Sequence, residues 1–526
     1  MKPIVDLLDS TLRDGAQAEG ISFSVEDKLN IVRKLDELGL SFIEAGNPGS
    51  NPKDLEFFRR AAQLPLKRAQ LAAFGSTRRK NTAVEEDENV RALLAADTEL
   101  IVLFGKAWAL HVKDILCTTP EENFSMIEDT CRFFRERGKR VFFDAEHFYD
   151  GYRADPDFAL EALAAAARGG AECLVLCDTN GGGFPDDIYA ATRAVCERFT
   201  LPVGVHTHDD GGMAVANAVM GVRAGASQVQ GTYLGFGERC GNADLSTLIP
   251  NLQLKLGVRC IPAENLHLLT AAARHIAEVC NVSLRHSHPY VGASAFAHKA
   301  GMHADGVLKN SASFEHVDPE AVGNERRFLM SEISGRTAVL QKIHRLCPAL
   351  TKDSPETGSI IEALKRLELS GYQFEGADSS FELLVRKHTG TYRPFFQLVN
   401  YKILSGRPSE PDCSASATVK VQVGDKLQLM AAEGNGPVNA LDKALRKALE
   451  VFYPTLATMH LIDYKVRVMD SKEATGASVR VLISSSDGAA VWTTVGVSHD
   501  VVEASWLALV DSIEYKLIKD LERNEI

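Results

Sequence analysis

Three separated segments of this 526-residue chain carry residue types that bind a metal ion. They are residues 9–17 (Asp-Ser-Thr-Leu-Arg-Asp-Gly-Ala-Gln), 206–212 (His-Thr-His-Asp-Asp-Gly-Gly) and 235–242 (Gly-Phe-Gly-Glu-Arg-Cys-Gly-Asn), and each follows a short apolar run. Residues i and i+2 of a strand share one face, so His206 and His208 can direct both imidazoles at the same ion. Two imidazoles and one carboxylate suit a divalent cation and leave coordination positions open for a substrate.

The candidate metal ligands are Asp14, His206, His208 and Asn242. Asp14 could instead stabilise a turn, and Asn242 could cap the helix that follows it. The two histidines could also form a hydrogen-bonded pair without an ion. We favour a metal site because Asp14 and Asn242 follow other strands, which a chance pair of histidines would not require. The expected ion is Mn²⁺, Mg²⁺ or Zn²⁺.

Two further charged residues are candidates for the reaction itself. Arg13 carries a planar guanidinium that suits a carboxylate or a developing alkoxide, with a structural ion pair as the alternative. Glu146 ends the apolar run 141–145 (Val-Phe-Phe-Asp-Ala), where a carboxylate is costly unless it is paired or used in chemistry. The basic triplet 78–80 (Arg-Arg-Lys) is either a solvated turn or a contact for coenzyme phosphates. We predict a functional role for Arg13 and Glu146, and a turn for the triplet.

Eight short apolar runs alternate with longer amphipathic stretches in the first half of the chain. The runs are residues 4–8, 41–45, 69–74, 100–104, 140–145, 173–177, 202–205 and 227–231. Stretches 24–38, 156–168 and 213–224 place apolar residues at helical spacing, and Ser24 and Asp155 are plausible caps. This alternation predicts a (β/α)8 TIM barrel, in which all the strand ends meet at one mouth and bring the candidate residues together. A doubly wound open sheet, the competing architecture, would keep the first and eighth strand ends apart.

Beyond residue 256 the pattern changes twice. We first predict a mostly helical linker, with helices at residues 262–280, 336–346, 357–369 and 377–386. We then predict strands at residues 417–423, 426–432, 460–469, 478–486 and 490–497, with helices at 437–451 and 501–518. The strands form two similar units that each end in a helix, which indicates an internal duplication around a pseudo-twofold axis. The predicted domains are a catalytic barrel (1–256), helical linker subdomains (257–394) and a C-terminal α+β regulatory or dimerisation domain (395–526).

Composition narrows the class of protein. The formal net charge of −12 argues against nucleic acids and anionic membranes as partners, because both need a basic face. The ten cysteines are scattered without Cys-x-x-Cys spacing, which indicates reduced thiols. No apolar run approaches the length of a membrane span, and residues 3–9 look like a strand rather than a targeting leader. We therefore expect a soluble, cytoplasmic protein.

The three metal-site segments together resemble those of the metal-dependent acyl-CoA Claisen condensing enzymes, which comprise the isopropylmalate, homocitrate and citramalate synthases. The resemblance covers essentially the whole chain, because residues 294–306, 318–323 and 434–440 resemble the linker and regulatory signatures of this family. Residues 44–54 and 144–152 are most similar to a bacterial branch of (R)-citramalate synthases. The resemblance implies an acyltransferase that condenses acetyl-CoA with pyruvate and hydrolyses the thioester, giving (R)-citramalate and CoA for isoleucine biosynthesis.

The resemblance also assigns roles to individual residues. The cation, held by Asp14, His206 and His208 with Asn242 nearby, polarises the carbonyl of pyruvate. Arg13 stabilises the alkoxide that forms when the acetyl carbanion attacks. The residues expected to contact the substrate are Arg13, Gln17, Asp144 and Thr179.

The base that removes the acetyl proton is left open between Glu146 and a pair formed by His303 and Asp305. In the family, the histidine matching His303 comes from the linker subdomain of the partner chain. Phe314 stands four residues before the Asp-Pro-Glu sequence, where the family usually has a tyrosine. No phenol is therefore available at this position for proton transfer.

Several rival functions remain open at this point. The nearest is a sister activity, isopropylmalate or homocitrate synthase, and a retro-aldol acyl-CoA lyase on the same barrel is more remote. A non-catalytic amino-acid sensor on the same scaffold is a different class, favoured only by Phe314. The C-terminal region resembles the allosteric domain of these synthases, which implies a homodimer or higher oligomer and feedback inhibition, with isoleucine as the expected effector.

Overall fold

The computed structural model describes residues 3–298, 301–328, 336–351, 353–374, 376–410, 413–469, 477–488 and 490–523. The chain divides into two compact units. The first unit comprises Met1–Phe296 with Glu315–Arg326, and the second comprises Ala297–Phe314 with Arg327–Ile526. The domain boundaries expected at residues 256 and 394 stay predictions.

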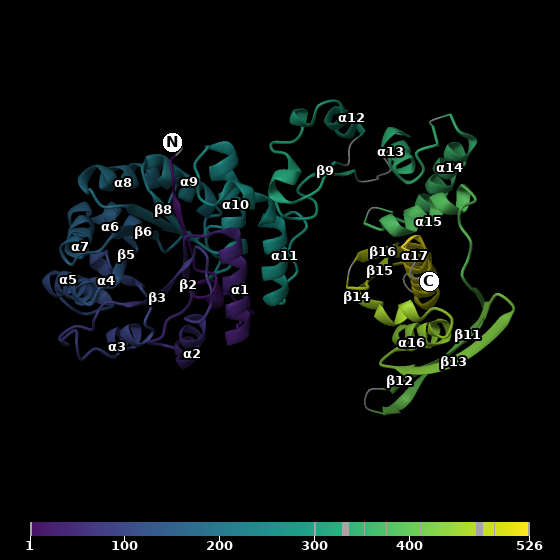
Figure 1. Ribbon diagram of the computed structural model, residues 1–526, viewed down its shortest axis with the longest axis horizontal. Coiled ribbons are helices and arrows are strands. Elements are labelled where there is room, and N and C mark those ends of the chain that lie inside the picture. Colours follow the sequence, from purple (N-terminus) through teal and green to yellow (C-terminus); the bar gives the residue numbers. More distant parts are fainter. Residues whose placement is uncertain are drawn as a thin grey trace. The chain divides into compact units, whose positions relative to one another are not determined.

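The first unit is built on a closed barrel of eight parallel strands (Figure 1). The first strand, β1, pairs with both β2 and β8. The strands are β1 (Asp6–Asp9), β2 (Phe42–Glu44), β3 (Gln70–Ser76), β4 (Leu100–Lys106), β5 (Arg140–Glu146), β6 (Cys173–Asp178), β7 (Val203–Thr207) and β8 (Gln228–Gly231). Each strand overlaps one of the eight predicted apolar runs. The barrel prediction is therefore confirmed, and the open-sheet alternative is wrong because β1 and β8 are hydrogen-bonded neighbours.

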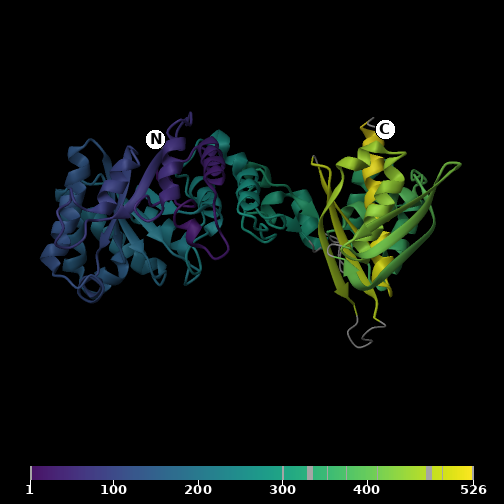
Figure 2. The same cartoon turned by 90° about the horizontal axis from the view of Figure 1, so that it is seen from below.

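Helices surround the strands of the barrel (Figure 2). They are α1 (Val25–Leu38), α2 (Pro52–Ala61), α3 (Glu88–Ala95), α4 (Ala109–Asp114), α5 (Pro120–Glu136), α6 (Phe148–Ala154), α7 (Pro156–Arg168), α8 (Pro185–Arg198), α9 (Ala214–Ala224), α10 (Leu245–Pro250) and α11 (Leu269–Val279). Both predicted caps are confirmed. Ser24 forms a capping box with Asp27 at the start of α1, and the side chain of Asp155 accepts a hydrogen bond from the Phe158 amide in α7.

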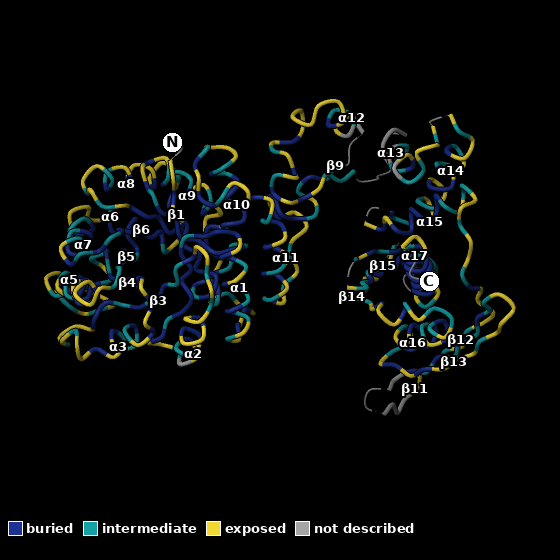
Figure 3. Tube along the Cα trace, viewed as in Figure 1, coloured by how far each residue is buried: buried dark blue, intermediate teal, exposed yellow. Residues whose placement is uncertain are grey.

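The inside of the barrel is filled by an apolar layer beneath the mouth. Its residues are Leu8, Phe42, Ala72, Leu100, Val102, Phe142, Cys173, Val175 and Cys177. Figure 3 shows the buried residues concentrated along the strands. Because side chains alternate along a strand, Glu44 and Asp144 point to the same side as Phe42 and Phe142, two positions nearer the mouth. The polar side chains of the mouth thus rest on a packed apolar floor.

The second unit begins with helices α12 (Gly301–Lys309), α13 (Arg336–Leu346), α14 (Pro355–Leu369) and α15 (Asp378–His388). The last three match the predicted helices closely, and α12 was not predicted. Its sequence contains Gly301 and Gly306, which lower helix propensity. The predicted helix at 262–280 is divided into a 3-10 turn (Ala263–Leu268) and α11, both in the first unit.

Two three-stranded antiparallel sheets, each followed by a helix, complete the second unit. One contains β11 (Gln397–Glu410), β12 (Cys413–Val423) and β13 (Lys426–Gly434) and precedes α16 (Pro437–Glu450). The other contains β14 (His460–Val468), β15 (Val479–Ser486) and β16 (Val491–Ser498) and precedes α17 (Val501–Glu522). The predicted pair of similar α+β units is confirmed, whereas β11 was missed. Among the described residues, no helix combines the length and apolar character that crossing a bilayer requires.

Candidate metal centre and active site

Three side chains converge at the mouth of the barrel. Asp14 lies in the turn after β1, His206 lies near the end of β7, and His208 follows β7 directly. The His206 Nε2 atom lies 3.5 Å from Asp14 Oδ2 and 3.3 Å from His208 Nε2, and His208 Nε2 lies 3.9 Å from the same carboxylate oxygen. All three residues are buried, and one possible ligand atom from each lies within 4.8 Å of the others. Asp14, His206 and His208 therefore form a metal-binding triad.

The protonation states of two triad residues, Asp14 and His208, also suit a cation. Burial opposes ionisation of Asp14, but Arg13 and the two histidines hold the pKa of its carboxyl well below the usual value. Burial and the neighbouring His206 lower the pKa of His208 to about 3, which keeps this imidazole neutral. The Oδ1 atom of Asp14 and the Nδ1 atom of His208 are buried without a hydrogen-bond partner in the described structure. Such unsatisfied groups are costly, and a bound cation would relieve the cost at the carboxylate.

Asn242 approaches the triad through its main chain, which forms an antiparallel bridge with His208. Its Nδ2 atom donates to the carbonyl of Phe236 at 3.2 Å, whereas its Oδ1 atom is buried and has no hydrogen-bond partner among the described residues. The helix that follows, α10, is capped by Asp244 instead, whose side chain accepts from the Ser246 amide. The free amide oxygen of Asn242 therefore fits a ligand better than it fits a helix cap.

Arg13 is held in place on three sides. Its Nε atom donates to Glu44 Oε2 at 2.6 Å, its Nη1 atom donates to Asp14 Oδ2 at 3.1 Å, and its guanidinium lies 3.7 Å from the centre of the Phe74 ring. Ser10 donates a further hydrogen bond to the same oxygen of Glu44. Burial opposes the charge of Arg13, but Glu44 and Asp14 outweigh it and raise the pKa of the guanidinium. The site thus contains a fixed, permanently charged cation beside the triad.

A cavity of about 210 Å³ opens above the triad and brings most of the predicted site residues together. It is lined by Arg13, Asp14, Gln17, Phe74, Phe104, Asp144, Glu146, Cys177, Thr179, His206, His208 and Glu238. The hydroxyl of Thr179 accepts a hydrogen bond from the His147 amide at 2.9 Å. Because that bond uses a lone pair, the hydroxyl proton of Thr179 remains able to donate to a ligand.

Two carboxylates differ in their surroundings within this cavity. Glu146 forms an ion pair with Lys106, its partner in the register between β4 and β5. Asp144 is nearly fully buried, and that burial, together with the charge of Glu44, raises the pKa of its carboxyl to about 7. Within this cavity, Glu146 is therefore the partly exposed carboxylate paired with a lysine, whereas Asp144 is the buried one.

His303 and Asp305 belong to the second unit, on α12. The ring of His303 stacks on Phe314, with centroids 4.3 Å apart, and Asp305 pairs with Lys309 at 2.6 Å. Phe314 thus contacts the proposed catalytic imidazole through its ring face. A part for His303 and Asp305 in the chemistry stays a prediction.

Sequence reasoning missed several residues of this site. Phe74, Phe104 and Cys177 line the cavity, and nothing distinguishes them in the sequence from other apolar strand residues. Gln230, in β8, contacts His206. The sequence signal that could have identified it is a polar residue within a buried strand. Arg78 pairs with Glu122 and Asp129, so it serves a structural turn rather than a coenzyme phosphate.

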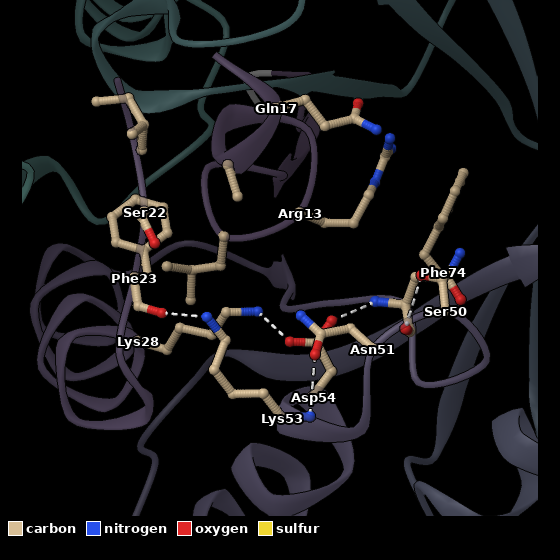
Figure 4. A pocket seen from close by; sticks show the side chains of 14 residues that line it. Arg13, Gln17, Ser22, Phe23, Lys28, Ser50, Asn51, Lys53, Asp54 and Phe74 are labelled. Atoms are coloured by element: carbon tan, nitrogen blue, oxygen red, sulfur yellow. Dashed lines mark hydrogen bonds and ion pairs between the residues drawn. The ribbon is translucent and has the colours of Figure 1, made fainter. Parts of the chain in front are cut away.

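A second cavity, of about 270 Å³, shares Arg13, Gln17 and Phe74 with the first (Figure 4). Lys28 donates to Asp54 Oδ1 at 2.6 Å and to the carbonyl of Ala45, and Asp54 Oδ2 accepts from the Asn47 amide. These bonds fix the loop between β2 and α2 that forms one wall. Further polar residues that line this cavity are Ser22, Ser50, Asn51 and Lys53.

Family comparisons agree with this arrangement. An HMGL-like family model matches residues 4–279, a homocitrate synthase post-HMGL domain-like model matches residues 290–370, and a LeuA allosteric (dimerisation) domain model matches residues 375–517. The strands of the barrel lie within the first of these matches, and the third covers α15 and the two α+β units except the last residues of α17.

Full-length relatives are more specific. The (R)-citramalate synthase of Aquifex aeolicus is 50% identical over 520 residues, which cover 98% of each chain. The (R)-citramalate synthase of Synechocystis is 50% identical, with 97% of this chain and 96% of the relative covered. The (R)-citramalate synthase of Geobacter sulfurreducens is 48% identical, with 99% and 98% covered. From the barrel, its buried triad and this end-to-end identity, the chain belongs to the HMGL-like family and, within it, to the (R)-citramalate synthases.

Proposed function

We propose that this chain condenses acetyl-CoA with pyruvate and hydrolyses the thioester, releasing (R)-citramalate and CoA. Citramalate synthase activity follows from 50% identity to (R)-citramalate synthases along almost the whole chain. The observation that carries the proposed chemistry is the buried triad Asp14, His206 and His208, which lies at a small cavity beside the fixed guanidinium of Arg13. An ion, a 2-oxo acid and a cationic side chain can meet there.

The donor set fits a divalent cation, with Mn²⁺, Mg²⁺ and Zn²⁺ as the candidates. Asp14, His206 and His208 supply three donors, and the unpartnered Oδ1 atom of Asn242 is the proposed fourth. When bound, the cation supplies Lewis-acid polarisation of the keto group of pyruvate.

The remaining steps belong to the chain's own side chains. Thr179 donates its free hydroxyl proton to the carboxylate of pyruvate, and Gln17 and Asp144 contact the same substrate. Arg13 stabilises the negative charge that develops on the former keto oxygen, because its guanidinium is already oriented by Glu44.

Removal of a proton from the acetyl methyl group requires a base close to the cavity. Glu146 lines the cavity beside Lys106, and its carboxylate is the group that we propose as the proton acceptor. A pair formed by His303 and Asp305 is the second candidate. We place the thioester arm of acetyl-CoA in the second cavity, because that cavity adjoins the first at Arg13 and Gln17 and is lined by lysines and amides.

The second unit is the regulatory part of this proposal. Its match to a LeuA allosteric (dimerisation) domain supports a homodimer or higher oligomer. Isoleucine is the proposed effector. A cytoplasmic location is proposed on the cysteines, since those with described side chains are free thiols.

The decisive test is CoA release by metal-stripped protein given a panel of 2-oxo acids, with and without Mn²⁺. Pyruvate is expected to give the highest kcat/KM, only with the metal, and His206→Ala is expected to reduce release to background while its melting temperature stays near that of the wild type. Preference for 2-oxoisovalerate or 2-oxoglutarate would replace the proposal with a sister activity. Undiminished release by His206→Ala would reject the metal site.

A further inference from the structure

A hydrogen-bonded relay lies behind one of the triad histidines. The Nδ1 atom of His206 lies 2.8 Å from Oε1 of Gln230, and Nε2 of Gln230 donates to Asp144 Oδ1 at 2.9 Å. Gln230 is fully buried, and the register between β7 and β8 places it directly beside His206. The relay therefore links side chains from three barrel strands: β7 and β8, which are hydrogen-bonded neighbours, and β5, which is not adjacent to either.

The relay has only one consistent arrangement of protons when Asp144 is ionised. A carboxylate only accepts hydrogen bonds, so the NH₂ group of Gln230 must face Asp144. The carbonyl oxygen of Gln230 then faces His206, and the proton of the neutral imidazole must reside on Nδ1. The lone pair is left on Nε2, the atom that lies 3.5 Å from Asp14 and 3.3 Å from His208.

We propose that Gln230 is a positioning residue that fixes the tautomer and ring orientation of His206 so that its Nε2 faces the metal position. This inference rests on the metal site of the proposed function. Histidine ligands commonly donate their second N–H to a neighbouring acceptor, and removal of such an acceptor typically weakens metal binding by about 10–100-fold. An amide fills the role here without adding a negative charge next to Asp144 and Glu44.

The strand offers a matched control. Gln228 lies two positions before Gln230, on the same face of β8, and is also buried, with Gly204 as its register partner in β7. Neither amide atom of Gln228 has a hydrogen-bond partner in the described structure. Gln228→Leu and Gln230→Leu thus make the same chemical change in the same strand, and only the second removes the contact with His206.

The first experiment titrates metal-free wild type and both variants with Mn²⁺, and follows the free Mn²⁺ signal by electron paramagnetic resonance. Gln230→Leu is expected to raise the Kd by about 10–100-fold, while Gln228→Leu stays within about twofold of the wild type. An unchanged Kd for Gln230→Leu, or an equal loss in both variants, would overturn the proposal. Failure of the wild type to bind Mn²⁺ would instead reject the metal site itself.

The second experiment needs no folded variant at position 230. Nitrogen-15 correlation spectra of the metal-free wild type at alkaline pH report which imidazole nitrogen carries the proton, with the His206 signal assigned by its loss in His206→Gln. A proton on Nδ1 is the expected result. A proton on Nε2 would overturn the proposal even if Gln230→Leu did not fold.

Discussion

Arg13 and Glu146 both line the active-site cavity, but their side chains are held in different ways. Arg13 is held by Glu44 and Asp14, so its position is set before any substrate binds. Glu146 pairs with Lys106, and its side chain is about a quarter exposed. Its greater exposure makes Glu146 better placed than the buried Asp144 to accept a proton from a substrate.

Glu146→Gln is therefore expected to lower kcat by about 10²–10⁴-fold with little change in the KM for pyruvate, because it removes the base and keeps the shape. Steady-state CoA release at saturating acetyl-CoA measures both constants. Glu197→Gln, at an exposed helix carboxylate paired with Arg193, is the matched control and should behave as the wild type. A normal kcat for Glu146→Gln would leave His303 and Asp305 as the base.

The triad and Gln230 show what a sequence reveals about a site. His206 and His208 were predictable, since a spacing of two residues at the end of a strand fixes a shared face. Gln230 was not, because its contact with His206 depends on the register of β7 against β8, which local sequence does not determine. Phe74 and Phe104 have the same apolar character in the sequence as other core residues, so only the folded barrel shows that they line the cavity.

At the scale of elements, α17 carries an acidic residue in an apolar setting. Glu514 is 1% exposed and accepts a hydrogen bond from the Phe395 amide, with Lys387 and Asp511 as charged neighbours. Burial raises the pKa of its carboxyl from 4.5 to about 7. The folded state therefore binds this proton more tightly than the unfolded chain.

The stability that Glu514 contributes should be fully present below about pH 4.5 and be lost as the pH rises through about 7. We expect the second unit to lose on the order of 2–3 kcal/mol between pH 5 and 8 from this group. Glu514→Gln should remove that part of the pH dependence. Urea unfolding followed by the fluorescence of Trp492 and Trp506 provides the measurement, and an identical pH dependence in the variant would contradict the expectation.

The elements themselves were largely predictable, for identifiable reasons. Most barrel strands are largely buried, so they read as predominantly apolar runs, with β8 and its two glutamines as an exception. In contrast, β11 is an edge strand whose later part includes Gly406 and Pro408, two residues that disfavour strands. Its pairing with β12 overrides that preference, as tertiary contacts commonly do.

At the scale of the whole molecule, the edge strand β14 presents an apolar row. Tyr464, Val466 and Val468 share one face and are between 39% and 54% exposed, and the charged Lys465 and Arg467 alternate with them. An exposed apolar row on an edge strand favours association with another surface. The match to a dimerisation domain makes a second copy of this chain the expected occupant.

Val466→Glu should therefore weaken the dimer, with a Kd raised at least about tenfold, because it places a charge in that row. Sedimentation equilibrium measures the change, and isoleucine titration against CoA release should show weaker inhibition. Lys465→Glu, on the opposite face of the same strand, is the control and should leave association unchanged. Equal association of Val466→Glu and wild type would move the interface elsewhere.

The rate at which the buried cysteines of the barrel unit are modified measures how often this unit opens. Cys117 and Cys240 are exposed, so an aromatic disulfide reagent should titrate them at once in native buffer. Cys173 sits in the apolar floor, and burial raises the pKa of Cys131 to about 12, which keeps the reactive thiolate scarce. The slow modification of Cys173 and Cys131 therefore reports how often the barrel opens transiently. The same background must be subtracted whenever released CoA is counted through its thiol.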